Sequence, residues 1–138
     1  MSELYLVNRT IDRAEALADR LQHEFPDLKV EVAYPPGTVD LLVNATSLGL
    51  QRGDPLPVDE DQFELNRAGA VYDMVYRPAT TPLLRAAKAV GARVANGLGM
   101  LLHQGARSLE IWTGRPAPLW AMREALEKDL YGPGSQQR

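Results

Sequence analysis

The sequence predicts the α/β class, with a doubly wound parallel sheet whose strands are joined by crossover helices. Short apolar runs that end in polar turns, typical of buried strands, alternate along the chain with segments whose apolar residues recur at helical spacing. This alternation indicates a parallel sheet, because each parallel connection needs a crossover, usually a helix. The length of 138 residues fits one domain.

The first half of the chain is predicted to hold three strands and one helix. Residues 4–7 form a short apolar run that ends in polar residues. A helix over 11–24 follows, since its apolar residues recur at helical spacing until Pro26 stops it. Residues 28–32 alternate apolar and charged side chains, which is typical of a half-buried strand near a sheet edge. The strongly apolar run 40–43 predicts a buried strand.

The second half is predicted to be richer in helices. Residues 49–66 are rich in Pro, Gly and acidic residues, which favours loops with one short helix around 59–63. The remaining expected elements are a strand at 70–75, a helix at 81–90 ended by Gly91, a strand at 93–95 and helices at 98–113 and 119–129. The domain is expected to span 1–130, followed by a disordered tail at 131–138.

Composition narrows the classes of function. The formal net charge of -3, with both signs interspersed, argues against a nucleic-acid-binding surface. The absence of cysteine excludes disulfides, thiolate metal sites and a cysteine nucleophile, and nothing else in the sequence suggests a metal. No apolar stretch approaches the roughly 18 residues of a membrane span, and the N-terminus lacks the pattern of a signal peptide. A cytoplasmic location without membrane contact is therefore expected.

Polar residues follow four of the expected strands directly. They are 8–10 (Asn-Arg-Thr), 44–47 (Asn-Ala-Thr-Ser), 76–77 (Tyr-Arg) and 96–97 (Asn-Gly). Taken singly, each is readily explained as a turn or a helix cap. Because ligands of open parallel sheets bind beyond the carboxyl ends of the strands, the four together favour a binding site at one edge of the sheet.

The first of these clusters bears on the choice of dinucleotide. A strand that selects NAD typically ends in a carboxylate, which hydrogen-bonds the ribose, whereas this strand is followed by Asn8 and Arg9. An arginine attracts a ribose 2′-phosphate and can stack on adenine, while Thr10 and Arg13 add donors nearby. These residues favour NADP over NAD. The alternative is that Arg9 and Arg13 are solvated surface residues.

Longer motifs carry a family resemblance. They are 8–10 with Arg13, 44–49 (Asn-Ala-Thr-Ser-Leu-Gly), 72–78 (Tyr-Asp-Met-Val-Tyr-Arg-Pro) with 81–84 (Thr-Pro-Leu-Leu), 96–106 (Asn-Gly-Leu-Gly-Met-Leu-Leu-His-Gln-Gly-Ala) and 112–114 (Trp-Thr-Gly). Together, in this order and spacing, they resemble shikimate dehydrogenases, oxidoreductases of aromatic amino acid biosynthesis that reduce 3-dehydroshikimate to shikimate with NADPH. The resemblance implies a Rossmann-type NADP-binding domain with C-terminal helices.

The resemblance also implies roles for individual residues. Cofactor-binding positions would be Asn8, Arg9, Thr10 and Arg13 at the 2′-phosphate, Ala45 and Thr46 along the groove, and Met74, Gly97 and Met100 near the nicotinamide. Tyr76 and Gln104 would contact the substrate, since a phenol and an amide can hydrogen-bond its hydroxyl and carboxylate groups. For Met100 and its neighbours Leu101 and Leu102, packing in the helix core is favoured over a binding role.

Two features of the family have no counterpart in the chain. One is the N-terminal substrate domain with its catalytic Lys and Asp; none of the lysines here lies at a predicted strand end, so no catalytic residue is assigned. The other is the first, central strand with its Gly-rich phosphate turn. The chain is therefore expected to be a fragment with an incomplete sheet, weak cofactor binding and little or no dehydrogenase activity.

Other interpretations remain open. The chain could be a non-catalytic nucleotide-binding module, or a subunit completed by another chain. A relative of glutamyl-tRNA reductase or methylene-tetrahydrofolate dehydrogenase is a weaker alternative, against which the motifs around Tyr76 and Gln104 count. The sequence leaves open whether quinate is also a substrate and whether the chain forms a homodimer.

Overall fold

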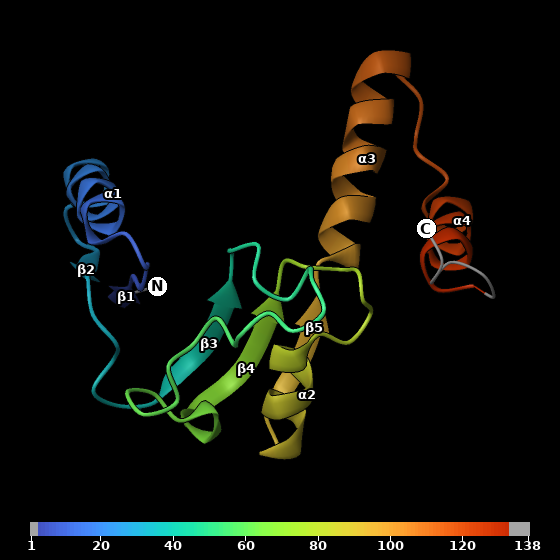
Figure 1. Ribbon diagram of the computed structural model, residues 1–138. Helices are drawn as coiled ribbons and strands as arrows, with labels where there is room; N and C mark the ends of the chain where they lie inside the picture. Colours follow the sequence, from blue (N-terminus) through green and yellow to red (C-terminus); the bar gives the residue numbers. More distant parts are fainter. Residues whose placement is uncertain (1–2, 133–138) are drawn as a thin grey trace.

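The structure is a computed structural model that describes residues 3–132 (Figure 1). The strands are β1 (Glu3–Tyr5), β2 (Lys29–Glu31), β3 (Val39–Asn44), β4 (Ala68–Asp73) and β5 (Arg93–Asn96). The helices are α1 (Ile11–Glu24), a 3-10 turn η1 (Leu65–Arg67), α2 (Pro82–Ala89), α3 (Leu98–Thr113) and α4 (Leu119–Tyr131). The predicted α/β class is confirmed, and the bounds of α1 and α3 agree with the expected helices.

The strands form two parallel sheets. One has the order β1-β2 and the other β3-β4-β5, and within the described part of the chain no strand pairs β1 with β3. Figure 1 shows β1 and β2 set apart from β3, at the side away from β5. The expectation that β1 and β3 each lack a neighbour therefore agrees with the structure. A parallel strand between them would join the two sheets into one.

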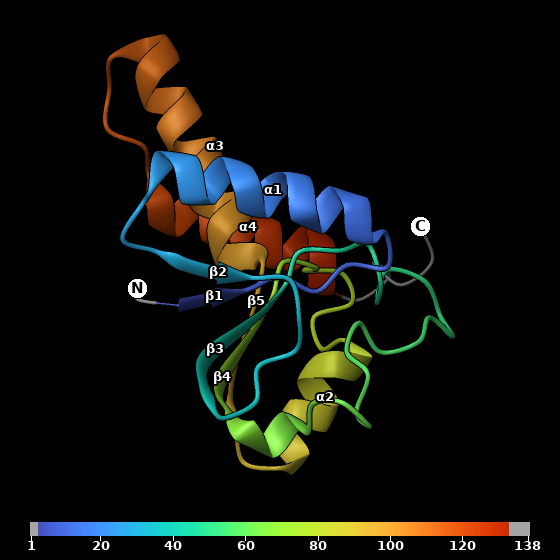
Figure 2. The same ribbon diagram turned by 90° about the vertical axis from the view of Figure 1, so that its left-hand side faces the viewer.

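Helices pack on both sides of the strands. Helix α1 contacts β2, whereas α2 contacts β4 and β5. Figure 2 shows α1 on one side of the strands and α2 on the other, which is the doubly wound arrangement. Helix α3 rises from the end of β5 and packs against α4 (Figure 1).

The hydrophobic core lies between the central strand β4 and helix α2. Thr81 caps α2 by accepting a hydrogen bond from the Leu84 backbone N–H, and Pro82 opens the helix. The apolar face of α2 then meets β4 and η1. The buried cluster consists of Phe63, Leu65, Ala68, Val71, Leu83, Leu84 and Ala87.

The other face of β3 is largely uncovered. Side chains alternate along a strand, so Leu42 packs against the core, while Leu41 and Val43 point the opposite way. Leu41 is 55% exposed and Val43 48% exposed. The prediction that this apolar run is a fully buried strand is therefore wrong for these two side chains, because no described strand or helix covers them.

Several expected boundaries also differ; the strand expected at 70–75, for example, is β4 at Ala68–Asp73. The short helix expected at 59–63 is a single turn, in which the Phe63 N–H donates to the Asp59 carbonyl, and the 3-10 turn η1 follows it. The Asp59 carboxylate accepts from the Asp61 backbone and the Gln62 side chain, which favours a turn over a continuing helix. Helix α4 reaches Tyr131, beyond the expected end. The rest of the expected tail, 133–138, lies outside the described residues.

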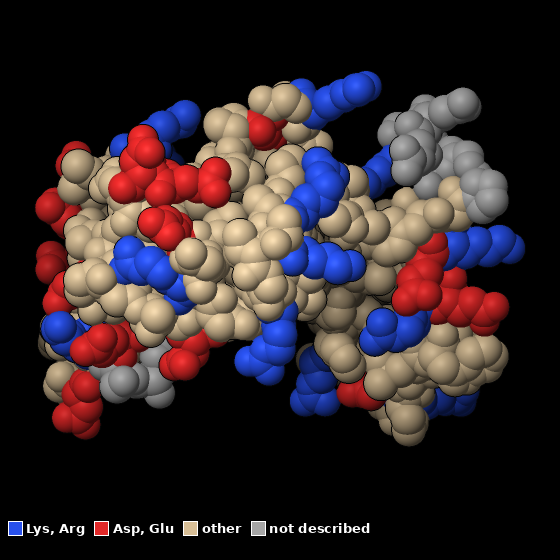
Figure 3. All heavy atoms as spheres, turned by 90° about the horizontal axis from the view of Figure 1, so that it is seen from below, with Lys and Arg blue, Asp and Glu red and all other residues tan. Residues whose placement is uncertain are grey.

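Within residues 3–132, none of the helices has the length and apolar character needed to span a bilayer. On the face shown in Figure 3, Lys and Arg side chains are interspersed with Asp, Glu and uncharged residues, and they do not merge into one continuous basic surface.

Candidate functional site

The last residues of the three paired strands lie side by side. In the parallel register Asn44 pairs with Asp73, and Asp73 pairs with Asn96. The expected clusters 44–47 and 96–97 therefore begin at one edge of the sheet, and the cluster 76–77 follows β4 after two loop residues. This edge is formed by the carboxyl ends of parallel strands, where ligands of such sheets bind.

A hollow of about 590 Å³ opens at this edge. It brings together four of the predicted site residues, Ala45, Thr46, Met74 and Tyr76. Two further lining residues, Leu50 and Leu130, were not predicted from the sequence. Leu130 belongs to helix α4, which is distant along the chain. The full lining is Ala45, Thr46, Leu50, Met74, Val75, Tyr76, Arg77 and Leu130.

A buried polar network lies beneath the hollow. Asp73 is 0% exposed, and its Oδ1 accepts hydrogen bonds from Asn44 Nδ2 at 2.9 Å and from the Val75 N–H at 3.0 Å. Its Oδ2 accepts from Thr81 Oγ1 at 2.5 Å. Asn44 and Thr81 are buried as well, so these bonds replace water as their partners. All three residues stand in the family-like motifs, but no role was predicted for them from the sequence.

The hydroxyl of Thr46 is already engaged within the protein. It donates to Asn44 Oδ1 at 2.8 Å and accepts from the Leu48 N–H at 3.1 Å. A hydroxyl has one proton and two acceptor lone pairs, so one lone pair remains for a ligand. The backbone N–H of Met74 is also engaged, with the Asn44 carbonyl at 3.0 Å. The wall formed by Thr46 and Met74 therefore offers an acceptor and apolar surface.

Gly97 is held against the backbone of Met74. A Cβ at position 97 would lie 2.0 Å from the Met74 carbonyl oxygen and 2.7 Å from its carbonyl carbon. The backbone angles of Gly97 (φ -71°, ψ -1°) are ordinary for any residue, so the close approach is what requires glycine here. The start of α3 can thus pack directly on the loop that carries Met74.

Helix α4 is tied to the same loop by Tyr131. The Tyr131 hydroxyl donates to the Tyr76 carbonyl at 2.6 Å and accepts from Asn96 Nδ2 at 3.1 Å. Partial burial raises the pKa of the Tyr131 phenol above its ordinary value of 10.0, because the anion would lose solvation. These bonds hold α4 beside the hollow, next to the position where Leu130 lines it.

The predicted phosphate-binding residues lie at the end of β1, across the gap between the two sheets. Asn8 Oδ1 accepts from the Thr10 N–H at 3.0 Å and shapes the turn into α1. The side chains of Arg9 and Arg13 are exposed. In Figures 1 and 2 this turn lies at the same level as the loop after β3, although these residues do not line the hollow. A ligand that contacts both places has to be extended.

The remaining predicted site residues lie on α3 outside the hollow. Met100 is 41% exposed, so the expectation that it packs in the helix core is wrong, whereas Leu102 is buried as expected. Gln104 and His103 are exposed. Neither Met100 nor Gln104 lines the hollow at the strand ends.

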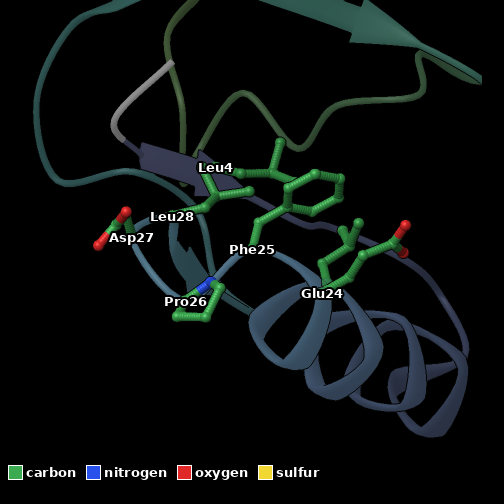
Figure 4. Close-up of a pocket in the computed structure, with 7 residues that line it drawn as sticks. Leu4, Glu24, Phe25, Pro26, Asp27 and Leu28 are labelled. Atoms are coloured by element: carbon green, nitrogen blue, oxygen red, sulfur yellow. The ribbon is translucent and has the colours of Figure 1, made fainter.

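A second hollow, of about 580 Å³, lies between β1 and the end of α1. Leu4, Phe25 and Leu28 supply its apolar surface, and the carboxylates of Glu24 and Asp27 stand at its sides (Figure 4). Two carboxylates disfavour a phosphate-bearing ligand there.

The chemistry that the described residues offer is recognition. The lining of the strand-end hollow contains no lysine, histidine or carboxylic acid. Within residues 3–132, no cluster of three or more His, Cys, Asp or Glu residues could hold a metal ion. Parallel strands with a hollow at their carboxyl ends and helices on both sides define an α/β domain of the Rossmann type.

Comparisons with known proteins show which proteins the chain is similar to. A family profile described as the shikimate 5'-dehydrogenase C-terminal domain matches residues 97–127. Shikimate dehydrogenase (NADP(+)) of Nitrobacter winogradskyi is 44% identical over 136 residues, a match covering 94% of this chain and 47% of the relative. Over nearly its whole length the chain is similar to shikimate dehydrogenases, and it spans about half the length of the curated relatives that it matches. The resemblance inferred from the motifs is confirmed.

Solved structures agree with this assignment. Shikimate 5-dehydrogenase from Thermus thermophilus, in complex with NADP(H) and shikimate, matches with a TM-score of 0.76 and 38% identity. That match covers 91% of this chain and 46% of the other. Quinate dehydrogenase from Corynebacterium glutamicum, in complex with NAD, matches with a TM-score of 0.75 and 27% identity over 91% of this chain and 46% of its own length. The predicted Rossmann-like fold is confirmed.

Proposed function

We propose that the chain is the NADP-binding part of an enzyme that reduces 3-dehydroshikimate to shikimate with NADPH. The observation that carries the proposal is the hollow at the carboxyl ends of β3 and β4, with Arg9 following the neighbouring sheet's β1 on the same side of the molecule. The relatives support it, since the Nitrobacter protein is named an NADP(+) enzyme and the Thermus structure holds NADP(H) and shikimate.

The cofactor would lie with its adenosine end after β1 and its nicotinamide end after β3 and β4. The 2′-phosphate of the adenosine would bind at Arg9 and Arg13, whose exposed guanidinium groups can pair with phosphate oxygens, beside Asn8 and Thr10. Asn8 stands where a strand that selects NAD typically ends in a carboxylate, and this favours NADP over NAD.

The nicotinamide end would occupy the strand-end hollow. Its ring would lie against Met74, whose backbone is packed closely on Gly97, and Gly97 would border the ring from the start of α3. Ala45 would line the groove, and the free lone pair of Thr46 suits an amide donor better than a phosphate. Met100 would border this region from α3.

The substrate would bind beside the nicotinamide, with Tyr76 and Gln104 as hydrogen-bonding partners. When bound, NADPH supplies the hydride, and the new alkoxide then needs a proton. A positioned acid is typically worth about 10²- to 10⁴-fold in rate. The hollow's lining has no lysine, histidine or carboxylic acid, so we infer that the proton donor comes from outside this lining.

Calorimetric titration of the 138-residue chain with NADP⁺ and NAD⁺ tests the proposal. We expect the unchanged chain to bind NADP⁺ more tightly than NAD⁺. Arg9→Gln should weaken the affinity for NADP⁺ about tenfold, because it removes one charged hydrogen-bonding contact. Binding of NAD⁺ should hardly change. Arg20→Gln removes the same charge from an exposed position farther along α1 and should leave both affinities unchanged. Equal affinity for the two dinucleotides would refute the role of Arg9.

A second candidate function is cofactor binding without catalysis by this chain alone. It is favoured by the lack of an acid in the hollow's lining. A steady-state assay of NADP⁺ reduction with shikimate, run on the 138-residue chain, distinguishes the two. We expect no turnover above background, and turnover at a rate ordinary for dehydrogenases would show that the chain supplies its own proton-transfer group.

A further inference from the structure

We propose that Asp73 is a positioning residue, which holds the two walls of the strand-end hollow in place and orients the hydroxyl of Thr46 toward a ligand. The proposal deepens the proposed function and rests on it. Asp73 is fully buried and does not line the hollow, so it acts through other residues.

The two walls come from different loops. Thr46 belongs to the loop after β3, and Met74 and Tyr76 belong to the loop after β4. Asp73 reaches both loops, because its Oδ1 accepts from Asn44 Nδ2 at 2.9 Å and from the Val75 N–H at 3.0 Å. One carboxylate oxygen therefore links the ends of two neighbouring strands.

The second carboxylate oxygen of Asp73 links the ends of β3 and β4 to helix α2. Thr81 Oγ1 donates to Asp73 Oδ2 at 2.5 Å and accepts from the Leu84 N–H at 3.3 Å. Thr81 is itself 0% exposed. The first turn of α2 and the ends of β3 and β4 are thus joined at one carboxylate.

The hydrogen bonds of this network share a direction. The Leu48 N–H donates to Thr46 Oγ1, and the Thr46 hydroxyl donates to Asn44 Oδ1. The Asn44 amide in turn donates to Asp73, as the Thr81 hydroxyl does from the other side. These four donors are directed along the chain toward the carboxylate, while the other N–H of the Asn44 amide donates to the Leu48 carbonyl at 3.0 Å. Such chains of hydrogen bonds reinforce one another in a buried setting.

This direction determines what the wall can recognise. With its proton directed to Asn44, the Thr46 hydroxyl presents an acceptor to the hollow. The N–H groups of Met74 and Val75 are used by the Asn44 carbonyl and by Asp73, so they do not face a ligand as donors. The wall therefore suits a ligand group that donates hydrogen bonds, such as a carboxamide, and it disfavours a phosphate at this end of the cofactor.

The test compares two ligands on three forms of the 138-residue chain. NADP⁺ carries a nicotinamide carboxamide, whereas adenosine 2′,5′-bisphosphate has the phosphate-bearing adenosine but no nicotinamide. Thr81→Val keeps the shape of the side chain but removes the hydroxyl that donates to Asp73, and Thr81→Ser keeps that hydroxyl. Affinities follow from NMR titrations, in which weak binding is measurable.

We expect Thr81→Val to weaken the affinity for NADP⁺ about tenfold and to change the affinity for adenosine 2′,5′-bisphosphate by less than about twofold. Thr81→Ser should bind both ligands about as tightly as the unchanged chain does. If Thr81→Val does not fold, Asp73→Asn keeps the size of the side chain but replaces one accepting oxygen with an NH2 group, and it should give the same loss for NADP⁺ alone.

The failures can be told apart. Equal weakening of both ligands, or no weakening in a folded variant, would overturn the positioning role of Asp73 and leave the proposed function standing. Binding of neither ligand by the unchanged chain would overturn the proposed function, and the positioning role with it.

Discussion

Gly97 offers the sharpest test of how the site is packed, because an added methyl group there has no space. The Cβ of Gly97→Ala would lie 2.0 Å from the Met74 carbonyl oxygen, 2.7 Å from its carbonyl carbon and 3.2 Å from its Cα. All three are backbone atoms, which cannot rotate away as a side chain can. The start of α3 and the end of β4 must therefore move apart, and the hydrogen bond from the Gly97 N–H to the Val75 carbonyl, 3.4 Å long, lengthens or breaks.

Overpacking of this kind costs about 1 to 3 kcal/mol of unfolding free energy, and more where backbone must move. The φ of -71° is accessible to alanine, so backbone strain adds nothing to that cost. For a chain of this size the loss corresponds to a fall in Tm of roughly 3 to 12 °C.

Gly99→Ala is the matched control. It lies two residues further into α3, and its Cβ would meet no atom within 4 Å. Alanine replaces glycine in a helix with a gain of up to about 1 kcal/mol, so this variant should melt slightly higher than the unchanged chain. Thermal unfolding followed by circular dichroism, checked by urea titration, measures both variants. A Gly97→Ala chain as stable as Gly99→Ala would refute the close contact between α3 and Met74.

Three further outcomes are expected. Tyr131→Phe removes the hydrogen bond to the Tyr76 carbonyl and should lower the unfolding free energy by about 1 kcal/mol in urea titrations; an unchanged midpoint would show that the bond does not hold α4. The raised pKa of the Tyr131 phenol favours its neutral form in the folded state, so the stability it contributes is complete below pH 10.0 and is lost as the pH rises through the folded-state pKa. Tyr131→Phe should therefore lose less stability between pH 9 and 11, which are roughly the bounds of tyrosine titration, and an equal loss in both chains would contradict the shift. Leu41→Thr and Val43→Thr change exposed side chains, so each should alter the unfolding free energy by less than about 0.5 kcal/mol. Both should also reduce aggregation measured by light scattering. A larger loss of unfolding free energy would mean that these side chains are covered in solution.

Much of the fold could be predicted from the sequence because its element ends carry strong local signals. Gly114, for example, has a φ of +67° and ends α3 in the left-handed conformation that glycine tolerates. Pro82, at the first position of α2, has no backbone N–H to satisfy there. The turn at Asp59 was mistaken for a helix because its carboxylate competes for local N–H groups, which a count of helix-forming residues does not register.

The candidate site was predictable where it follows strands and not where it depends on distant contacts. Ala45, Thr46, Met74 and Tyr76 come directly after apolar runs, and they meet in one hollow because parallel strands end at one edge. Leu130 and Tyr131 belong to α4, where Tyr131 is 55 residues beyond Tyr76, and nothing local indicates where that helix packs. Asp73 carried one usable signal, a carboxylate inside an apolar strand, which requires buried partners.

The unpaired edges of β1 and β3 have a consequence for the cofactor. Residues 8–13 follow β1, whereas the hollow is lined from the loops after β3 and β4, so the distance between them depends on how the two sheets are held. A dinucleotide that contacts both would lose affinity if the sheets moved independently, because binding would then have to order them. Weak binding by the 138-residue chain is expected on this ground.

The most direct test of a nucleotide site at the strand ends is to map where NADP⁺ binds, by amide chemical-shift changes in two-dimensional NMR spectra of the 138-residue chain. We predict that the largest changes fall together in 8–13, 44–50, 73–77 and 96–98, the ends of β1, β3, β4 and β5 with the turns that follow them. Changes confined to the hollow beside Phe25, or spread over the surface without those four segments, would contradict a cofactor site at this edge of the sheet.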